Sequence, residues 1–410
     1  MKYLVVIGDG MADYPVNELG GKSPLQIAYH PNMDALARKG VCGTVRTIPS
    51  GMDANTDVAI LSIMGYDPRR YKIGRGALEA ASMGVALSDH EVAFRINLVT
   101  EKEGILKDYA AGHISTEEAR QLILILKEFL EEPNVKFCPG LSYRHLLILG
   151  KPYSDEVHCY PAHDVVGRRI TEILAKPKNS DAKKTADLLN NLVLKSRAIL
   201  TNHPINIERS KSGNFPANMI WPWGPGKKPN ICTLREKYRL SSAVISAVDV
   251  VNGLGVYAGM DLVKVPGATG FIDTNYEGKA DYALRALENH DLVLIHVEAP
   301  DEAGHIGDPY LKVKTIEDLD RRLLGRLLEK IQGEYAIAVL SDHFTPVSVR
   351  THKDDPVPFV FYSTNNTCGG VHSFDEVSAS SSSLKLEDGY RLLRLFLEYG
   401  CSKSDALFGR

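Results

Sequence analysis

The chain of 410 residues carries 48 lysines and arginines against 51 aspartates and glutamates, a net charge of −3 at pH 7. This balance gives no sign of a nucleic-acid-binding surface, and no apolar run approaches the roughly 20 residues of a membrane span. The length predicts two or more domains, or one domain with a large insertion. Six scattered cysteines without a CxxC pair predict reduced thiols in a cytoplasmic protein: Cys42, Cys138, Cys159, Cys232, Cys368 and Cys401.

The N-terminal part begins with a predicted buried strand. Residues 3–7 (YLVVI) are apolar and lead into Gly8-Asp9-Gly10, without the small-residue cleavage site of a signal peptide. A helix is expected over Asn32–Lys39, with Asn32 as its cap.

The middle of the chain is basic, whereas the rest is acidic. Residues 95–230 hold 20 basic and 15 acidic side chains, a balance of +5, and the remainder holds 28 and 36, a balance of −8. Helices are expected over Thr116–Glu132, capped by Ser115 or Thr116, and over Asp181–Leu200. The stretch WPWGPGKKPN at residues 221–230 is rich in proline and glycine and predicts a hinge loop.

The C-terminal part alternates buried strands with helices. Strands covered on both faces are predicted at 291–297, 335–340 and 358–362, and helices at 279–287 and 313–331. The alternation predicts a layered α/β fold with a largely parallel sheet. The serine-rich segment at 378–383 is expected to form a solvated turn.

Each predicted strand adjoins side chains that can bind metal ions. Ligand sites in open α/β sheets gather at the carboxyl ends of strands, and mixed carboxylate and imidazole ligands suit zinc or manganese. Six such side chains suffice for two cations, which can stabilise the entering and leaving oxygens of a displacement at phosphorus. The candidates are Asp9, Asp301, His305, Asp342, His343 and His352.

A phosphoryl-transfer enzyme also needs a nucleophile or a positioned water. The hydroxyl candidates near the N-terminal strand are Ser50, Thr56 and Ser62, and spacing alone does not choose between them.

Six motifs at both ends of the chain together resemble the archaeal-type, cofactor-independent phosphoglycerate mutases of the alkaline phosphatase superfamily. In chain order they are GDGM at 8–11, NTDVAILSIMGYDP at 55–68, VKVPGATGFIDTNY at 263–276, HVEAPDEAGHIGD at 296–308, SDH at 341–343 and RTH at 350–352. As a set, in family order, they are highly specific.

The resemblance implies an alkaline-phosphatase-like layered α/β/α core. Residues 1–94 and 231–410 would form this metal-binding domain, and residues 95–230 a smaller inserted α+β domain that handles the substrate. It also implies two divalent metal ions (manganese, zinc or cobalt) and no need for 2,3-bisphosphoglycerate. One ion would be bound by Asp301, His305 and His352, and the other by Asp9, Asp342 and His343, with the hydroxyl of Thr56 bridging toward it.

By the same resemblance, Thr56 would be the nucleophile that moves a phosphoryl group between the hydroxyls of glycerate. The activity would interconvert 3-phosphoglycerate and 2-phosphoglycerate in glycolysis and gluconeogenesis. The position is commonly serine in the family, and threonine keeps the Oγ atom but restricts χ1.

A small phosphorylated acid needs cationic and polar partners, because arginine forks bind phosphate and carboxylate groups well. No nucleic-acid or membrane partner is expected, and the oligomeric state is left open. Two alternatives share the metal core: a phosphotransferase resembling proposed homoserine kinases, suggested by residues 108–115 and 297–305, and a hydrolase of phosphate or sulfate esters. The candidate substrate-binding residues are Arg75, Arg95, Asn97, His113, Arg144, His163 and Lys237.

Overall fold

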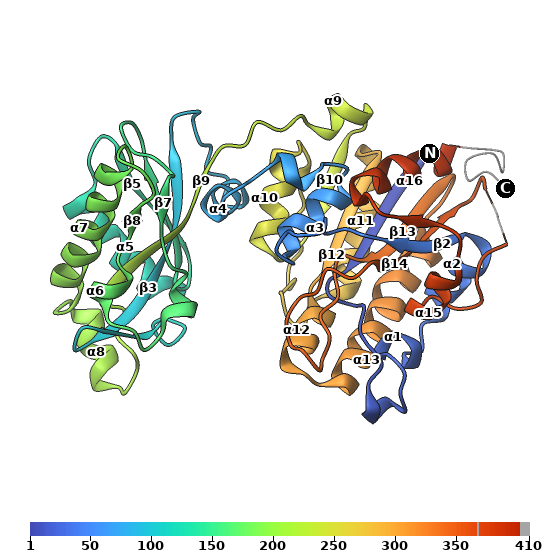
Figure 1. Cartoon of the computed structure of the whole chain (residues 1–410), viewed down its shortest axis with the longest axis horizontal. Helices are drawn as coiled ribbons and strands as arrows, with labels where there is room; N and C mark the ends of the chain where they lie inside the picture. The colour runs from blue at the N-terminus through green and yellow to red at the C-terminus, as the bar shows by residue number, and fades with distance from the viewer. Residues whose placement is uncertain (367–368, 402–410) are drawn as a thin grey trace. The chain divides into compact units, whose positions relative to one another are not determined.

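The computed structural model describes residues 1–366 and 369–401, and the chain divides into two compact units (Figure 1). Unit 1 combines Met1–Lys72 with the chain from Ile231 onward, and unit 2 is Ile73–Asn230. The second division coincides with the expected boundary at 230/231, whereas the first lies at 72/73 instead of 94/95. The reason is that helix α4 (Arg75–Ser82) packs against strands β3 (Val92–Lys102) and β9 (Met219–Lys227), and β3 runs unbroken through residue 94.

Unit 1 is built on a sheet with the strand order β11-β10-β12-β1-β13-β14-β2-β15. Its neighbouring strands are parallel except at β14, which is antiparallel to both β13 and β2. The expected layered α/β fold with a largely parallel sheet is therefore confirmed. The strands are β1 (Lys2–Gly8), β2 (Val41–Val45), β10 (Ser242–Ile245), β11 (Asp261–Leu262), β12 (Leu292–Val297), β13 (Tyr335–Ser341), β14 (Val357–Ser363) and β15 (Lys385–Leu386).

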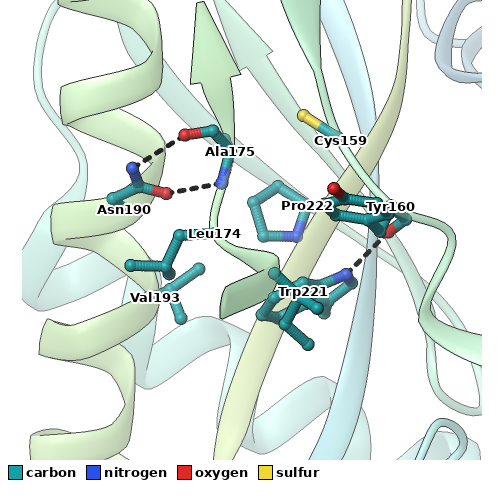
Figure 2. Close-up of a pocket in the computed structure, with 9 residues that line it drawn as sticks. Cys159, Tyr160, Leu174, Ala175, Asn190, Val193, Trp221 and Pro222 are labelled. Atoms are coloured by element: carbon teal, nitrogen blue, oxygen red, sulfur yellow. Dashed lines mark hydrogen bonds between the residues drawn. The ribbon is translucent and has the colours of Figure 1, made fainter. Parts of the chain in front are cut away.

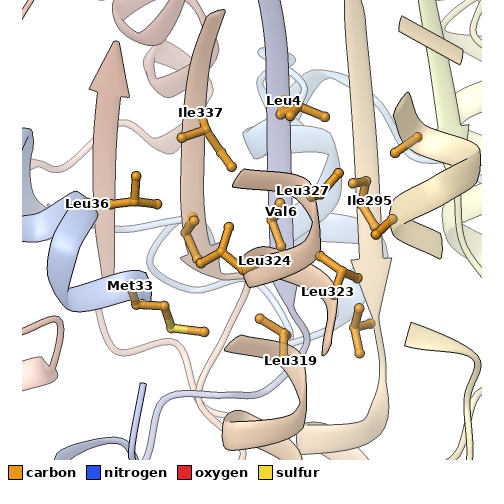
Figure 3. Close-up of a cluster of buried hydrophobic side chains, with 14 of the residues drawn as sticks. Leu4, Val6, Met33, Leu36, Ile295, Leu319, Leu323, Leu324, Leu327 and Ile337 are labelled. Carbon is orange, nitrogen blue, oxygen red and sulfur yellow. The ribbon is translucent and has the colours of Figure 1, made fainter. Parts of the chain in front are cut away.

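Helices pack on both faces of this sheet. Leu4 and Val6 of β1 point into an apolar cluster formed with α2 (Pro31–Lys39), α11 (Tyr276–Asn289), the π-helical segment η4 (Leu319–Leu324) and α14 (Gly325–Lys330) (Figure 3). The neighbouring residue Tyr3 contacts α16 (Leu392–Cys401), with its ring centroid 5.6 Å from that of Phe396. Alternation along a strand thus divides the apolar side chains between two helical layers.

The other helices of unit 1 are mostly short. They are η1 (Asn17–Leu19), α1 (Pro24–Ile27), α3 (Thr56–Ile63), η2 (Pro68–Arg70), α9 (Leu234–Tyr238), α10 (Asp249–Tyr257), α12 (Ala299–Ile306), α13 (Pro309–Asp318), α15 (Glu376–Ser381) and η5 (Gly389–Arg391).

Two local predictions in unit 1 were wrong. Asn32 does not cap α2, which begins at Pro31; its amide groups bind Asp320 of η4 instead, and that buried carboxylate also accepts the Met33 N–H at 2.7 Å. The serine-rich segment is not a turn, because residues up to Ser381 continue helix α15, which Asp375 caps through the Ser378 N–H. In both places a carboxylate supplies the helix cap.

Unit 2 contains an antiparallel sheet in which β3 pairs with β6, β4 and β9, and β6 pairs with β5. Even-numbered residues of β3 pack against the long helices α5 and α7, whereas Arg95 and Asn97 alternate onto the opposite face. Ser115 caps α5 as expected, by accepting the Glu118 N–H. The further elements are β4 (Ile105–Asp108), α5 (Thr116–Leu130), β5 (Val135–Leu141), β6 (Arg144–Leu149), β7 (Val157–His158), η3 (Ala162–Val165), α6 (Ile170–Ile173), β8 (Lys176–Pro177), α7 (Lys183–Leu200) and α8 (Pro204–Lys211).

The predicted hinge loop is largely a strand, so the loop prediction was wrong, although the chain returns to unit 1 at the end of this segment, after Asn230. Residues up to Lys227 belong to β9, which pairs with β3 through a register shift between Ala93 and Arg95. Pro222 and Pro225 are tolerated because β9 pairs with β3 alone among the described strands, so each missing N–H can face away from the ladder.

The interior of unit 2 has no cavity large enough for a metabolite beside Cys159. The cavity there measures about 10 Å³, which is the space of one water, and it lies among Cys159, Asn190 and Trp221 (Figure 2). Burial raises the pKa of the Cys159 thiol to about 12. The described cysteines are all free, and Cys368 lies outside the described residues.

No helix in the described ranges is long and apolar enough to cross a membrane.

Candidate active site

The six predicted metal ligands converge at one edge of the unit 1 sheet. Gly8, the last residue of β1, pairs with Val297 of β12 on one side and with Ser341 of β13 on the other. The three parallel strands therefore end at the same level. Asp9 and Asp342 follow directly, and α12, which begins two residues after β12, carries Asp301 and His305.

His352 joins this group because β14 is antiparallel to its neighbours. The start of an antiparallel strand lies at the edge where the parallel strands end, so the loop that precedes β14 passes over the same site. The sequence pattern placed His352 before a strand instead of after one, and the strand direction explains why.

Donor atoms of these side chains lie close enough to hold cations. Atoms of Asp301, His343 and His352 lie within 4.8 Å of one another, and so do atoms of Asp9, Asp342 and His343. The Nε2 atom of His305 lies 3.1 Å from Asp301 Oδ2 and 3.1 Å from His352 Nε2. The expected ligands thus form one continuous cluster, in which His343 belongs to both groups of donor atoms.

In two of the imidazole rings, the Nδ1 atom contacts a backbone carbonyl and the Nε2 atom is directed into the cluster. His305 Nδ1 lies 3.0 Å from the Arg350 carbonyl oxygen, and His352 Nδ1 lies 3.1 Å from that of Ala54. A carbonyl accepts only, so both rings carry a proton on Nδ1. In the neutral form, which metal binding requires, the Nε2 atom of each ring keeps a lone pair for the ion.

The charges of the cluster also fit a bound cation. Within the described part of the chain, Asp9 Oδ1 and Asp342 Oδ2 are buried and accept no hydrogen bond. Burial and the neighbouring charges of Asp342 and Asp301 raise the pKa of Asp9 well above its ordinary value. A hydrogen bond to Asp301 raises the pKa of His305 to about 9. Divalent cations would provide the positive charge that these carboxylates lack, so the donor set fits the metals expected from sequence.

Of the three hydroxyl candidates, Thr56 is the one at the cluster. It is the first residue of α3, and its Oγ1 lies 3.3 Å from His343 Nε2. Ser62 is buried further along the same helix, with 1% of its surface exposed, and Ser50 lies in an exposed loop. Asn55 makes no side-chain cap on α3, and the N-terminus of a helix favours a phosphoryl group.

Two residues of the cluster were missed from sequence. His296, inside β12, is fully buried, and its Nε2 lies 3.1 Å from Asp9 Oδ2. Thr345 lies between Asp301 and His343 and hydrogen-bonds to both. A histidine inside an otherwise apolar strand was an available signal for His296. Nothing in the local pattern distinguishes Thr345 from other loop threonines.

Unit 2 brings six of the predicted substrate-binding residues into a second cluster, which we call the arginine cluster. Trp223 is its centre: the guanidinium groups of Arg95 and Arg75 lie 5.0 and 5.8 Å from the Trp223 ring centroid. The Trp223 ring also lies 5.6 Å from that of His163, and its Nε1 donates to Asn97 Oδ1 at 3.0 Å.

Tyr143 and Tyr109 extend the arginine cluster. Arg144 lies 6.0 Å from the Tyr143 ring, and the His113 ring lies 5.8 Å from it. Tyr109 contacts Tyr143, His113 and His163 through edge-to-face ring contacts. The three aromatic residues were missed from sequence, because their role as a platform depends on the strand pairing.

One carboxylate orients two of the arginines. Glu79 is buried and accepts from Arg95 Nη1 at 2.7 Å and from Arg75 Nε at 3.0 Å. The guanidinium groups that Glu79 orients can bind carboxylate or phosphate oxygens through paired hydrogen bonds, which suits a small anion.

The loop that carries His113 has an unusual backbone. Ala111, Gly112 and His113 are consecutive residues with φ of 48°, 61° and 52°. Asp108 stabilises the loop by accepting the N–H groups of Ala110 and Gly112. Non-glycine residues at positive φ cost energy and concentrate at functional sites.

Lys237 is the remaining candidate for substrate binding. It lies in unit 1, where its ammonium donates to the Gly65 carbonyl oxygen and lies 4.7 Å from the Tyr66 ring centroid. Burial lowers the pKa of this ammonium. The described contacts of Lys237 are therefore with the loop after α3 and with its own helix.

The chain is similar to proteins of one family along nearly its whole length. A family model described as 2,3-bisphosphoglycerate-independent phosphoglycerate mutase matches residues 37–206, and one described as type I phosphodiesterase / nucleotide pyrophosphatase matches residues 162–359. A 2,3-bisphosphoglycerate-independent phosphoglycerate mutase of Methanosarcina barkeri is 50% identical to this chain over 402 residues. The match covers 97% of this chain and 100% of the relative. A protein of Geobacter sulfurreducens, named as a probable member, is 49% identical over 407 residues, 97% of this chain and 100% of the relative.

Solved structures give the same result. A protein of Pyrococcus horikoshii superposes with a TM-score of 0.83 at 30% identity, covering 100% of this chain and 99% of that one. A cofactor-independent phosphoglycerate mutase from Thermoplasma acidophilum has a TM-score of 0.69 at 30% identity, covering 98% and 100%. These matches confirm the family and the fold class expected from sequence. The chain belongs to the family of 2,3-bisphosphoglycerate-independent phosphoglycerate mutases.

Proposed function

We propose that the protein interconverts 3-phosphoglycerate and 2-phosphoglycerate through a phosphothreonine formed on Thr56, in the cytoplasm and without 2,3-bisphosphoglycerate. The family supports the overall reaction. The observation that carries the mechanism is the position of Thr56 Oγ1, 3.3 Å from His343 Nε2 and at the start of a helix. The free thiols of the described cysteines support a reducing compartment.

The transfer balances without water or a second phosphate donor. Thr56 Oγ1 forms a bond to phosphorus while the bond from phosphorus to the C3 oxygen of glycerate breaks, and a proton passes from the threonine hydroxyl to that oxygen. In the second half the C2 hydroxyl loses its proton, bonds to phosphorus and releases Thr56, which regains a proton. The β-branched side chain of Thr56 has few χ1 rotamers, which favours a fixed direction of attack.

Two divalent ions would be held by the six ligands named above. When bound, they would lower the pKa of the attacking hydroxyl and balance the charge of the phosphoryl oxygens. The N-terminus of α3 adds backbone dipoles directed at the same group.

For the substrate we propose the arginine cluster of unit 2. The planar guanidinium groups of Arg75, Arg95 and Arg144 suit the carboxylate and phosphate of glycerate phosphate, and the aromatic rings restrict their directions. The imidazole rings of His113 and His163, which contact Tyr109, add hydrogen-bond donors or acceptors to the arginine cluster. Lys237 has no comparable support and stays a prediction from the resemblance.

The test is a coupled assay for 2-phosphoglycerate formed from 3-phosphoglycerate, without added bisphosphoglycerate, after chelation and after restoring manganese, cobalt or zinc. Activity should vanish on chelation and return with metal. Thr56→Ala should lose about a thousandfold or more in kcat and accumulate no phosphorylated protein, whereas Thr56→Ser should stay active. Full activity in Thr56→Ala would reject the nucleophile. Release of inorganic phosphate would indicate a hydrolase, and phosphorylation of homoserine from a phosphoryl donor would indicate a kinase.

A further inference from the structure

Thr345 connects the two ligand groups of the candidate metal centre through one hydroxyl. Its Oγ1 donates a short hydrogen bond to Asp301 Oδ1 and lies 3.2 Å from His343 Nδ1. Asp301 belongs to one group of close donor atoms, and His343 to both. Thr345 and His343 are fully buried, so water does not compete for these contacts.

The hydroxyl has one proton, and this determines the tautomer of His343. Because that proton is donated to the Asp301 carboxylate, Thr345 Oγ1 must accept from His343, and His343 Nδ1 must carry the hydrogen. The Nε2 atom then keeps a lone pair. It lies 3.3 Å from Asp9 Oδ1 and 3.4 Å from Asp342 Oδ2, so a nitrogen lone pair and two carboxylate groups face one another, an arrangement that suits a bound cation.

The backbone of Thr345 is fixed on both sides. Its N–H donates to the Ala12 carbonyl oxygen at 3.3 Å, and its own carbonyl accepts from Lys312 Nζ at 2.8 Å. Lys312 is fully buried and also donates to Asp13 Oδ2 at 2.7 Å and to the Ala12 carbonyl. All three ammonium hydrogens are used, so this lysine joins the loop after β1 to the loop after β13.

We propose that Thr345 is a positioning residue for the metal centre. Its hydroxyl orients the Asp301 carboxylate and holds His343 in the tautomer whose Nε2 faces the metal position, while Lys312 and Asp13 hold the threonine in place. The inference rests on the metal centre of the proposed function, and it adds a residue that is not itself a ligand.

The experiment compares Thr345→Val, which keeps the shape and removes the hydroxyl, with Thr345→Ser, which keeps the hydroxyl. Thr185→Val is the control. It removes another fully buried threonine hydroxyl, which accepts from the Ser154 amide in unit 2. Each chelated protein is titrated with manganese and with zinc by calorimetry, and the cobalt-loaded forms are compared by their visible absorption.

We expect Thr345→Val to bind metal about 10- to 100-fold more weakly than the wild type and to change the cobalt spectrum. The metal affinities of Thr345→Ser and Thr185→Val should stay within a few-fold of the wild-type affinity. Equal metal affinity in Thr345→Val and the wild type would overturn the proposal, and so would a loss in Thr345→Ser as large as that in Thr345→Val. A wild type that binds no divalent ion would instead reject the metal centre itself.

A second measurement does not depend on whether the valine variant folds. The zinc-loaded wild type with ¹⁵N-labelled histidine should show His343 with a proton on Nδ1 and none on Nε2, with His343→Gln used to assign the signal. A proton on Nε2 would overturn the proposal.

Discussion

Gly10 lies where the loop after β1 passes Asp301 and Thr345, and a single methyl group there should disturb the metal centre. The residue has a φ of +55°, and a Cβ at this position would lie 2.5 Å from both Asp301 Oδ1 and Thr345 Oγ1. It would also lie 2.9 Å from the Cα of Asp301, whereas ordinary van der Waals contact is 3.4–4 Å. The neighbours of a Gly10→Ala variant must therefore move by roughly 1 Å.

Two costs contribute to the expected loss of stability. The left-handed backbone costs an alanine about 1–2 kcal/mol, and overpacking at a buried site costs about 1–3 kcal/mol more. Gly20 separates them, because it has a φ of +68° in the same unit and a Cβ there meets nothing within 4 Å. Gly20→Ala therefore pays only the backbone cost. The difference in unfolding free energy between the two variants, about 1–3 kcal/mol, measures the cost of the close contact with Asp301 and Thr345.

The assay is denaturant unfolding of both variants in chelator, followed by calorimetric titration with manganese. We expect Gly10→Ala to unfold more easily than Gly20→Ala and to bind metal about 10- to 100-fold more weakly, because Asp301 is displaced. Gly20→Ala should bind metal like the wild type. If the two variants match in both stability and metal affinity, the loop is not packed against Asp301 and Thr345 as described.

Three further outcomes are expected. Asp320→Ala should lower the unfolding free energy by about 2 kcal/mol, because α2 loses the carboxylate that accepts its N-terminal amides. Asp320→Asn should lower the unfolding free energy by less, and an equal decrease in the two variants would contradict the capping role. The Glu376 carboxyl, held by the Ser23 hydroxyl and the Asp13 amide, has its pKa raised by burial from 4.5 to about 7. Its protonated form therefore stabilises the fold fully below pH 4.5, and this contribution, at most about 3 kcal/mol, is lost as the pH rises through 7. Urea unfolding of Glu376→Gln between pH 5 and 8 should lack this decline, and an unchanged pH dependence would contradict it. Arg144→Ala should raise the KM for 3-phosphoglycerate about tenfold or more with little change in stability. The control Arg168→Ala removes an arginine that stacks on Tyr160 outside the arginine cluster, and an equal rise in KM would remove Arg144 from the substrate site.

Much of the candidate site could be predicted from sequence because its ligands follow strands. A buried apolar run identifies a strand in a parallel sheet, and the polar residue after it must lie at the carboxyl edge. Asp9, Asp301 and Asp342 follow this rule, and the register of β1 with β12 and β13 brings their strand ends level. The alternation of strands and helices likewise predicts the layered fold.

The local errors arose where tertiary contacts override local pattern. The proline- and glycine-rich segment before residue 230 is a strand because β3 provides a partner for it, and Asn32 is no cap because Asp320, distant in the chain, caps the helix. Local propensity describes neighbours in the chain, and these partners are not neighbours.

The sequence by itself thus determined the acidic scaffold, the basic middle and the residue types able to bind metal and phosphate. Spacing does not choose among the chemically similar hydroxyls of Ser50, Thr56 and Ser62, and Thr56 was implied by the resemblance. Only the tertiary structure places the Thr56 hydroxyl, at the start of α3, beside the ligands. It also gives the reason why His352, already a candidate from sequence, joins the cluster although it precedes a strand, because β14 runs antiparallel to its neighbours. It decided that Arg95 meets Trp223, through the pairing of β3 with β9. Residues far apart in sequence meet through strand direction and register, and a pattern read along one chain does not contain either.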